Sequence, residues 1–101
     1  MGNMTFESGG ERYSIYFTYG KHDGKREVGC VIKSQDDDNY ASGSSLCSEG
    51  DRFVKEVGRE IALERALRFA IKKRGKRADF WDSAMRCYHN RRKPGSRQVA
   101  V

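Results

Sequence analysis

Residues 48–73 form the longest periodic segment of this 101-residue chain and predict one long helix. Ser48 has the residue type of an N-cap, and Asp51 follows it at the spacing of a capping box. One apolar stripe lies in the first half of this helix and comprises Phe53, Val54, Val57 and Ile61. A second stripe follows on nearly the opposite side, and comprises Ala62, Leu63, Ala66, Leu67 and Ala70. The apolar face therefore changes sides near Ile61, which predicts that the two halves pack on different partners.

Gly58 interrupts the first half of the predicted helix, where it costs about 1 kcal/mol relative to alanine. Two interpretations stay open. Another backbone approaches the helix closely at this position, or the glycine is a tolerated surface residue.

The segment before the helix predicts three strands, at residues 4–8, 11–19 and 27–33. Gly9 and Gly10 supply a tight hairpin turn, and residues 20–25 form the second turn. Strict alternation along residues 11–19 indicates that one face of the sheet is buried and one is exposed to water. The first half of the long helix is the expected cover for the buried face.

Residues 34–47 are polar and rich in glycine and serine, so they predict a connecting loop. Asp36, Asp37 and Asp38 could supply oxygen ligands to a divalent cation. The glycine-centred spacing of an EF-hand and its distal glutamate do not accompany them, so a solvated loop is the preferred interpretation.

Gly75 has the residue type of a helix C-cap, and a second helix is expected from Asp79 to about Asn90. Its apolar stripe, predicted to pack antiparallel on the second half of the long helix, comprises Phe80, Trp81, Ala84, Met85 and Tyr88. The predicted fold class is therefore α+β: a three-stranded antiparallel meander, a long helix and a shorter antiparallel C-terminal helix (βββαα).

Composition fits one small domain, because 37% of the residues are hydrophobic and 34% are charged. Residues 1–92 are expected to form this domain, and residues 93–101 a flexible basic tail. The sequence has neither an apolar run of membrane-spanning length nor a signal peptide, so a cytoplasmic protein without membrane contact is expected.

The sequence shows no cluster of residues typical of a catalytic or metal-binding site. Cys30, Cys47 and Cys87 lack the spacing of a disulfide framework or a zinc site, which predicts free thiols and no metal or other cofactor. Glu56, Glu60 and Glu64 follow an i, i+4 row that is typical of a solvent-exposed helix face. No common catalytic motif is present, so we expect no enzymatic activity and assign no catalytic residue.

Positive charge is concentrated in the last third of the chain. Residues 1–67 hold nine Lys/Arg and twelve Asp/Glu, a net charge of −3, whereas residues 68–101 hold eleven and two, a net charge of +9. Arg65, Arg68 and Lys72 share one helix face that continues into the basic turn after it. The predicted binding residues are Arg65, Arg68, Lys72, Lys73, Arg74, Lys76, Arg77 and Arg86, together with Tyr16 as an exposed aromatic on the wet face of the sheet.

Three interpretations of this basic cluster stay open: a solvated face that keeps the protein soluble, a contact with nucleic acid, and docking on an acidic or nucleoprotein surface. Nucleic acid would be favoured more strongly if aromatic side chains were interleaved with the basic ones. The aromatic residues of the last helix are assigned to the core instead.

Part of the predicted helix carries the pattern Asp51-x-Phe53-x-Lys55-x-x-Gly58-Arg59-x-x-Ala62-x-x-Arg65-Ala66-Leu67. This run resembles a segment of small accessory proteins of tailed bacteriophages, in which a short sheet precedes such a helix. The resemblance implies a viral origin, the cytoplasm of an infected bacterial host, and a setting rich in non-enzymatic inhibitors of host defence, including anti-CRISPR proteins.

Two functional hypotheses follow from the resemblance and the charge. In the first, the chain is an inhibitor that binds a host protein or nucleoprotein complex, such as a CRISPR effector, and blocks its action. In the second, it is a basic accessory protein that binds DNA or RNA by contacting phosphates through its Lys/Arg cluster. Either function is compatible with a monomer or a homodimer.

Overall fold

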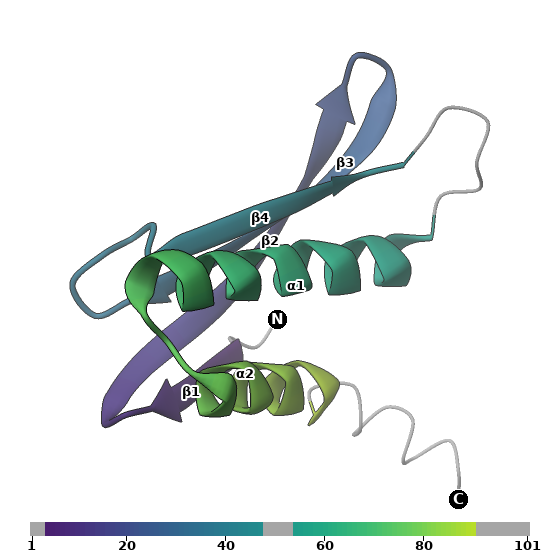
Figure 1. The fold of residues 1–101 in the computed structure, drawn as a ribbon. Helices are drawn as coiled ribbons and strands as arrows, with labels where there is room; N and C mark the ends of the chain where they lie inside the picture. The colour runs from purple at the N-terminus through teal and green to yellow at the C-terminus, as the bar shows by residue number, and fades with distance from the viewer. Residues whose placement is uncertain (1–3, 48–53, 91–101) are drawn as a thin grey trace, which may run out of the picture.

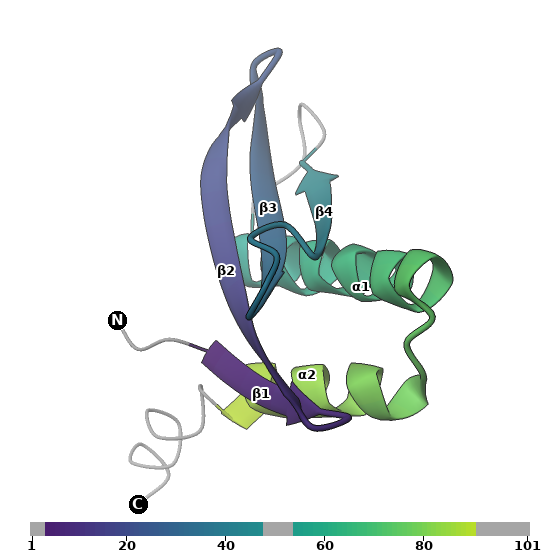
Figure 2. The same ribbon diagram turned by 90° about the vertical axis from the view of Figure 1, so that its left-hand side faces the viewer.

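A computed structural model describes residues 4–47 and 54–90 and shows an α+β fold. The order of its elements is β1 (Met4–Ser8), β2 (Glu11–His22), β3 (Lys25–Ser34), β4 (Ala41–Leu46), α1 (Lys55–Arg74) and α2 (Ala78–Asn90). The strands form one antiparallel sheet in the order β1-β2-β3-β4, so every strand pairs with its neighbours in sequence. Both helices lie against the same face of this sheet (Figures 1 and 2).

The fourth strand corrects the predicted three-stranded meander and the predicted loop at residues 34–47. β4 pairs antiparallel with β3, from Ala41 opposite Ile32 to Leu46 opposite Glu27. Sequence reasoning missed this strand because the positions that face the helices are small: Ala41, Gly43 and Ser45. Alternation of such residues with serines does not produce the apolar pattern by which strands are normally recognised.

Small residues also explain how closely α1 lies on the sheet. A Cβ atom added to Gly43 would lie 2.5 Å from the backbone nitrogen of Ala66. One added to Gly58 would lie 2.8 Å from Cγ2 of Val28, and the Ser45 hydroxyl donates a hydrogen bond to the Gly58 carbonyl oxygen at 3.0 Å. Gly58 is therefore needed for close packing and is not a tolerated surface glycine, but the atoms that approach it belong to the side chains of Val28 and Ser45 and not to another backbone.

The predicted change of apolar side along the long helix is wrong. The buried residues of α1 are those of the second stripe, Ala62, Leu63, Ala66, Leu67 and Ala70, and α1 packs mainly on β4 and β3. Val57 is 50% exposed and Ile61 is only partly buried, so these described members of the first stripe do not cover the sheet. Most of these positions hold alanine because its small side chain permits the close helix–strand contact. Val57 lies on the side of α1 that is turned away from the sheet.

The predicted end of the long helix agrees with the structure at the C-terminus of α1. Gly75 adopts the left-handed conformation with φ 71°, and the backbone N–H of Lys76 donates to the carbonyl of Ala70, so the predicted C-cap is confirmed. The described helix begins at Lys55, and Val54 caps it without a side-chain hydrogen bond. Ser48, Asp51 and Phe53, on which the predicted start depended, lie outside the described residues.

α2 runs back in the direction opposite to α1 (Figure 1), but it packs mainly on β1 rather than on the second half of α1. Its predicted stripe is confirmed, because Phe80, Ala84 and Tyr88 are fully buried and Trp81 and Met85 pack against the core. The Phe80 ring meets Phe6 of β1 and Tyr13 of β2 edge-on, with centroids 5.2 and 5.0 Å away. An aromatic cluster therefore joins the last helix to the first two strands.

The β2–β3 hairpin is longer than predicted and projects beyond α1 (Figure 1). Its turn is confined to Asp23 and Gly24, whose φ angles of 55° and 79° suit a two-residue hairpin turn. The strands therefore extend to His22 and Lys25, within the segment predicted to be a six-residue turn at 20–25. Because of this extension, several basic residues of the hairpin lie beyond α1.

The remaining predictions concern the ends of the chain and membranes. The predicted tail at residues 93–101 lies outside the part of the chain that the structure describes. Neither described helix combines the length and the apolar character required to cross a bilayer.

Candidate functional site

The outward side of the second half of α1 carries a cationic surface with an aromatic residue in it. Arg65, Arg68 and Lys72 are exposed, and they recur at the i, i+3 and i+7 spacing that keeps side chains on one side of a helix. Phe69 is 42% exposed and follows Arg65 by four residues. We call these four residues the basic face of α1.

The cations of the basic face are not neutralised by carboxylates among residues 4–47 and 54–90. Nη1 of Arg65 donates to the backbone carbonyl of Ser44 on the edge strand β4 at 2.8 Å. The guanidinium carbon of Arg68 lies 5.9 Å from the centre of the Trp81 ring. Both contacts hold a side chain in place and leave its positive charge without a counterion.

Three further predicted binding residues follow the basic face in the chain: Lys73 at the end of α1, Arg77 in the turn and Arg86 on α2. All three are exposed, and no hydrogen bond or ion pair within the described segments holds them. They add positive charge to the later part of the described chain, but no contact within the described residues fixes their side chains.

Arg74 and Lys76 are occupied inside the fold. Arg74 forms an ion pair with Asp37 at 3.0 Å, and its Nε donates to the carbonyl of Tyr40 at 2.9 Å. Nζ of Lys76 lies 5 to 6 Å from the ring centres of Tyr13, Tyr40 and Phe80. A hydrogen bond with Tyr13 raises the pKa of Lys76, which keeps the ammonium charged over the rings. These two predicted binding residues attach the α1–α2 turn to the loop before β4.

Tyr16 is exposed as predicted, at 38%, but it lies on the other face of the sheet. Nζ of Lys33 on the neighbouring strand lies 4.5 Å from the centre of its ring. Tyr16 therefore does not join the basic face, and Phe69 is the aromatic residue that sequence reasoning missed. Its spacing from Arg65 and Lys72 is a signal that could have revealed it.

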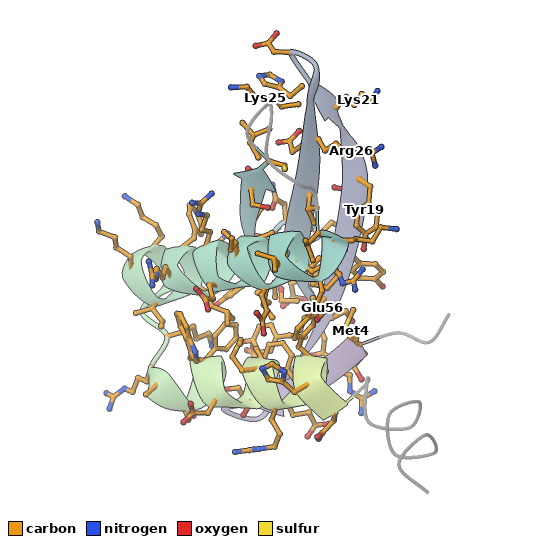
Figure 3. The ribbon with its side chains drawn as sticks, turned by 90° about the vertical axis from the view of Figure 1, so that its right-hand side faces the viewer. Met4, Tyr19, Lys21, Lys25, Arg26 and Glu56 are labelled. Carbon is orange, nitrogen blue, oxygen red and sulfur yellow. The ribbon has the colours of Figure 1, made fainter. Side chains whose placement is uncertain are left out.

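A second cationic surface lies beside the β2–β3 hairpin, around a hollow of about 360 Å³. The residues that line this hollow are Tyr19, Gly20, Lys21, Arg26, Glu27 and Lys55. Figure 3 shows Tyr19, Lys21 and Arg26 along one side of the hairpin and Lys25 on the other. Of these lining residues, only Gly20 and Lys21 fall in the turn predicted at residues 20–25, and none of the six is among the predicted binding residues.

Tyr19 is held in place at the edge of the hollow. Nη1 of Arg59 donates to its hydroxyl oxygen at 3.2 Å, and Nζ of Lys55 lies 4.7 Å from the centre of its ring. Tyr19 is nevertheless 50% exposed. The residue therefore presents a positioned aromatic surface next to three basic side chains.

Behind this surface, Glu56 connects the two helices, and its predicted place on a solvent-exposed face is wrong. The Tyr88 hydroxyl of α2 donates to Oε2 of Glu56 at 2.5 Å, and Arg59 pairs with Oε1 at 2.6 Å. Glu60 lies 3.9 Å from Nε2 of His89. Glu56 therefore contacts a guanidinium group and a phenol of the fold itself, and Glu60 lies near an imidazole ring.

The cysteines are free thiols, as predicted, and Cys30 is buried. Sγ of Cys87 donates to the Thr5 carbonyl of the edge strand β1 at 3.3 Å. Within the described part of the chain, no group of three or more His, Cys, Asp or Glu residues lies close enough together to hold a metal ion.

Comparison with protein-family models, with curated proteins and with solved structures finds no match to this chain. The resemblance to accessory proteins of tailed bacteriophages therefore stays a prediction.

Proposed function

We propose that the chain is a non-enzymatic binding protein that contacts nucleic acid through the basic face of α1. The observation that carries this proposal is the position of Phe69, which is 42% exposed beside Arg65 and Lys72 on the outward side of one helix. Basic side chains neutralise phosphates, and an adjacent aromatic ring offers a surface on which a base stacks.

The dimensions of the basic face suit a short stretch of a nucleic-acid strand. Seven residues separate Arg65 from Lys72, which corresponds to about 10 Å along a helix. Phosphates of one duplex strand rise by about 3.4 Å each along the duplex axis, so a helix segment of this length that lies parallel to the axis spans about three of them. Two or three neutralised phosphates predict a slope of log affinity against log salt of about −2 to −3 on duplex DNA.

Docking on a host nucleoprotein defence machine, such as a CRISPR effector, is the second candidate function. It is favoured by the start of α1, where Val54 at the N-cap and Val57 in the helix are 45% and 50% exposed. Apolar side chains beside a basic surface resemble the mixed core and rim of a protein–protein interface. In this function the same face would contact an acidic protein surface or the bound nucleic acid, and the chain would act as a phage-type inhibitor.

Fluorescence anisotropy with labelled single-stranded and duplex oligonucleotides tests the first function. We expect binding at low salt that weakens as salt rises from about 50 to 200 mM. The double variant Arg68→Glu/Lys72→Glu should lose it. The matched control Lys25→Glu/Lys33→Glu changes the net charge equally, away from the basic face, and should retain most of the affinity. Absence of binding at low salt, or equal loss in the control, would contradict the proposal.

The second function is tested with a purified CRISPR effector nuclease and its DNA target. The inhibitor hypothesis expects that the chain lowers the cleavage rate and that Val57→Asp restores it while oligonucleotide binding persists. Unchanged cleavage at saturating concentrations of the chain, across effectors of several types, would rule against this function.

A further inference from the structure

We propose that the hollow beside the β2–β3 hairpin is a binding site for a nucleotide unit, a planar base that carries a phosphate. Two of its features point to this chemistry: a positioned aromatic ring and an excess of positive charge. Neither belongs to the basic face of α1, so the proposal does not depend on the function proposed above.

The aromatic feature is Tyr19. Because Arg59 fixes its hydroxyl group and Lys55 lies over its ring, the side chain is oriented before any ligand arrives. A pre-oriented ring loses little conformational entropy on binding. Half of the residue remains exposed, so a base can stack against it, and stacking on aromatic rings is tolerant of base identity.

The charged feature is the lining of the hollow. Lys21, Arg26 and Lys55 contribute three positive charges, and Glu27 contributes one negative charge. Lys21 and Lys55 alone outnumber the carboxylate, so the hollow favours an anion even when Arg26 is engaged elsewhere. A phosphate group between the two lysines would lie beside a base stacked on Tyr19.

The size and openness of the hollow agree with a nucleotide. Its volume of about 360 Å³ falls within the range of about 300 to 1,000 Å³ typical of small-molecule sites. The hollow opens to solvent at the side of the hairpin, so a nucleotide can enter it free or as part of a strand. Both sources share the chemistry of a base and a phosphate, and the experiment distinguishes them.

The hollow is separated from the basic face along α1. Lys55 is the first residue of α1, and ten to seventeen residues separate it from Arg65 and Lys72. At 1.5 Å per residue this amounts to about 15 to 26 Å. Ligand binding at the hollow and at the basic face can therefore be told apart by the NMR signals of individual backbone amides.

Titration followed by two-dimensional NMR of the backbone amides tests the proposal with three probes: AMP, inorganic phosphate and a short oligothymidylate. We expect AMP to shift the amides of Tyr19, Lys21 and Lys55 and to leave those around Phe69 unchanged. Inorganic phosphate should bind more weakly because it cannot stack. The oligothymidylate should shift the same amides if a strand enters the hollow, and only AMP should do so if the site selects free nucleotides.

Two pairs of variants locate the site. Lys21→Ala should weaken AMP binding by about fivefold, as expected for one exposed charge contact, whereas Lys25→Ala on the other side of the hairpin should not. Tyr19→Phe keeps the ring but loses the hydrogen bond from Arg59, so it should weaken AMP binding less than Tyr19→Leu, which removes the stacking surface. The amide spectra of the variants also report whether each remains folded.

Three outcomes would overturn the proposal: no shift of the hairpin amides by AMP, shifts by phosphate as large as those by AMP, or equal effects of Lys21→Ala and Lys25→Ala. The variant Arg68→Glu/Lys72→Glu should still bind AMP in the hollow. Failure of the function proposed for α1 is therefore distinguishable from failure of this site.

Discussion

Ser45 of β4 donates its hydroxyl hydrogen to the carbonyl oxygen of Gly58 in α1, at a distance of 3.0 Å. This bond is possible because glycines at positions 43 and 58 let the helix lie directly on the strand. The close contact fixes which side of α1 is turned outward. It therefore determines that Arg65, Arg68, Phe69 and Lys72 reach solvent together.

The helix–strand contact predicts that Gly43→Ala is destabilising. The added Cβ would meet the Ala66 nitrogen at 2.5 Å and the Ala62 carbonyl oxygen at 2.7 Å, and neither backbone atom can rotate away. We expect the free energy of unfolding to fall by about 1 to 3 kcal/mol, measured by urea denaturation followed by circular dichroism. Gly20→Ala, also in a strand but with open space around it, is the control and should change stability little. Equal effects of the two substitutions would contradict the packing described.

The hydrogen bond from Tyr88 to Glu56 predicts energetic coupling between the two helices. Tyr88→Phe should lower the free energy of unfolding by about 1.5 to 3 kcal/mol, because the bond is made to a charged group. In a Glu56→Gln background the same substitution should cost less. A double-mutant cycle measures the difference, and strictly additive effects would show that the two side chains do not interact.

Burial raises the pKa of the Cys30 thiol to about 12. An unfolded cysteine ionises near pH 8.5, so above this pH the unfolded state releases a proton that the folded state retains. The contribution of Cys30 to stability is therefore fully present below about pH 8.5 and is lost as pH rises towards 12. Comparison of urea denaturation of the parent protein and of Cys30→Ala from pH 8 to 10.5 should show a steeper decline in the parent. Parallel curves would exclude the shift.

The same burial predicts the reactivity of the thiols at pH 8. Cys30 should react with a thiol reagent only after unfolding, whereas Cys47 and Cys87, which are partly exposed, should react in the native protein. Mass spectrometry of the modified protein identifies the site. Native modification of Cys30 at the rate of Cys47 would contradict its burial.

Phe69→Ala should separate stacking from charge in the proposed nucleic-acid contact. Because Phe69 is 42% exposed, we expect little change in stability and a loss of affinity for single strands of about 1 to 3 kcal/mol. Val57→Ala removes a similarly exposed apolar side chain outside the basic face and should leave oligonucleotide affinity unchanged. An effect of Val57→Ala on oligonucleotide affinity as large as that of Phe69→Ala would contradict the stacking role of Phe69.

Sequence patterns predicted the strands and turns that carry strong local signals. Gly9 and Gly10 have the positive φ angles that a hairpin turn requires, and β1 has the predicted bounds. Gly75 ends α1 as predicted, since few other residues adopt its left-handed conformation without strain. In each case the local chemistry permits few alternatives, so one sequence is sufficient.

The errors arose where contacts between elements decide the structure. β4 was not predicted because the small size of Gly43 and Ser45 reflects their contact with α1. This contact joins segments that are far apart in sequence. Val57 looked like a core residue because it is more hydrophobic than Ala62, yet the alanine is buried and the valine is exposed. Periodicity ranks side chains by hydrophobicity, but a tight helix–strand interface selects them by size.

The candidate site was predicted only in part for the same reason. The shared side of Arg65, Arg68 and Lys72 follows from helix geometry alone. The diversion of Arg74 to Asp37 depends on the loop before β4, and the hollow at Tyr19 depends on the hairpin that projects past α1. Neither partner is close in sequence, so neither relationship was visible before the fold was known.

The pairing of β1 with α2 has a consequence for synthesis on the ribosome. Phe6 is among the first described residues to be translated, and Phe80, which meets its ring at 5.2 Å, is made more than seventy residues later. A nascent chain can assemble the hairpins early and stack Phe6 on Tyr13, but the contact of Phe6 with Phe80 cannot form until α2 has left the exit tunnel. Packing of the β1–β2 hairpin against α2 should therefore be among the last events of cotranslational folding.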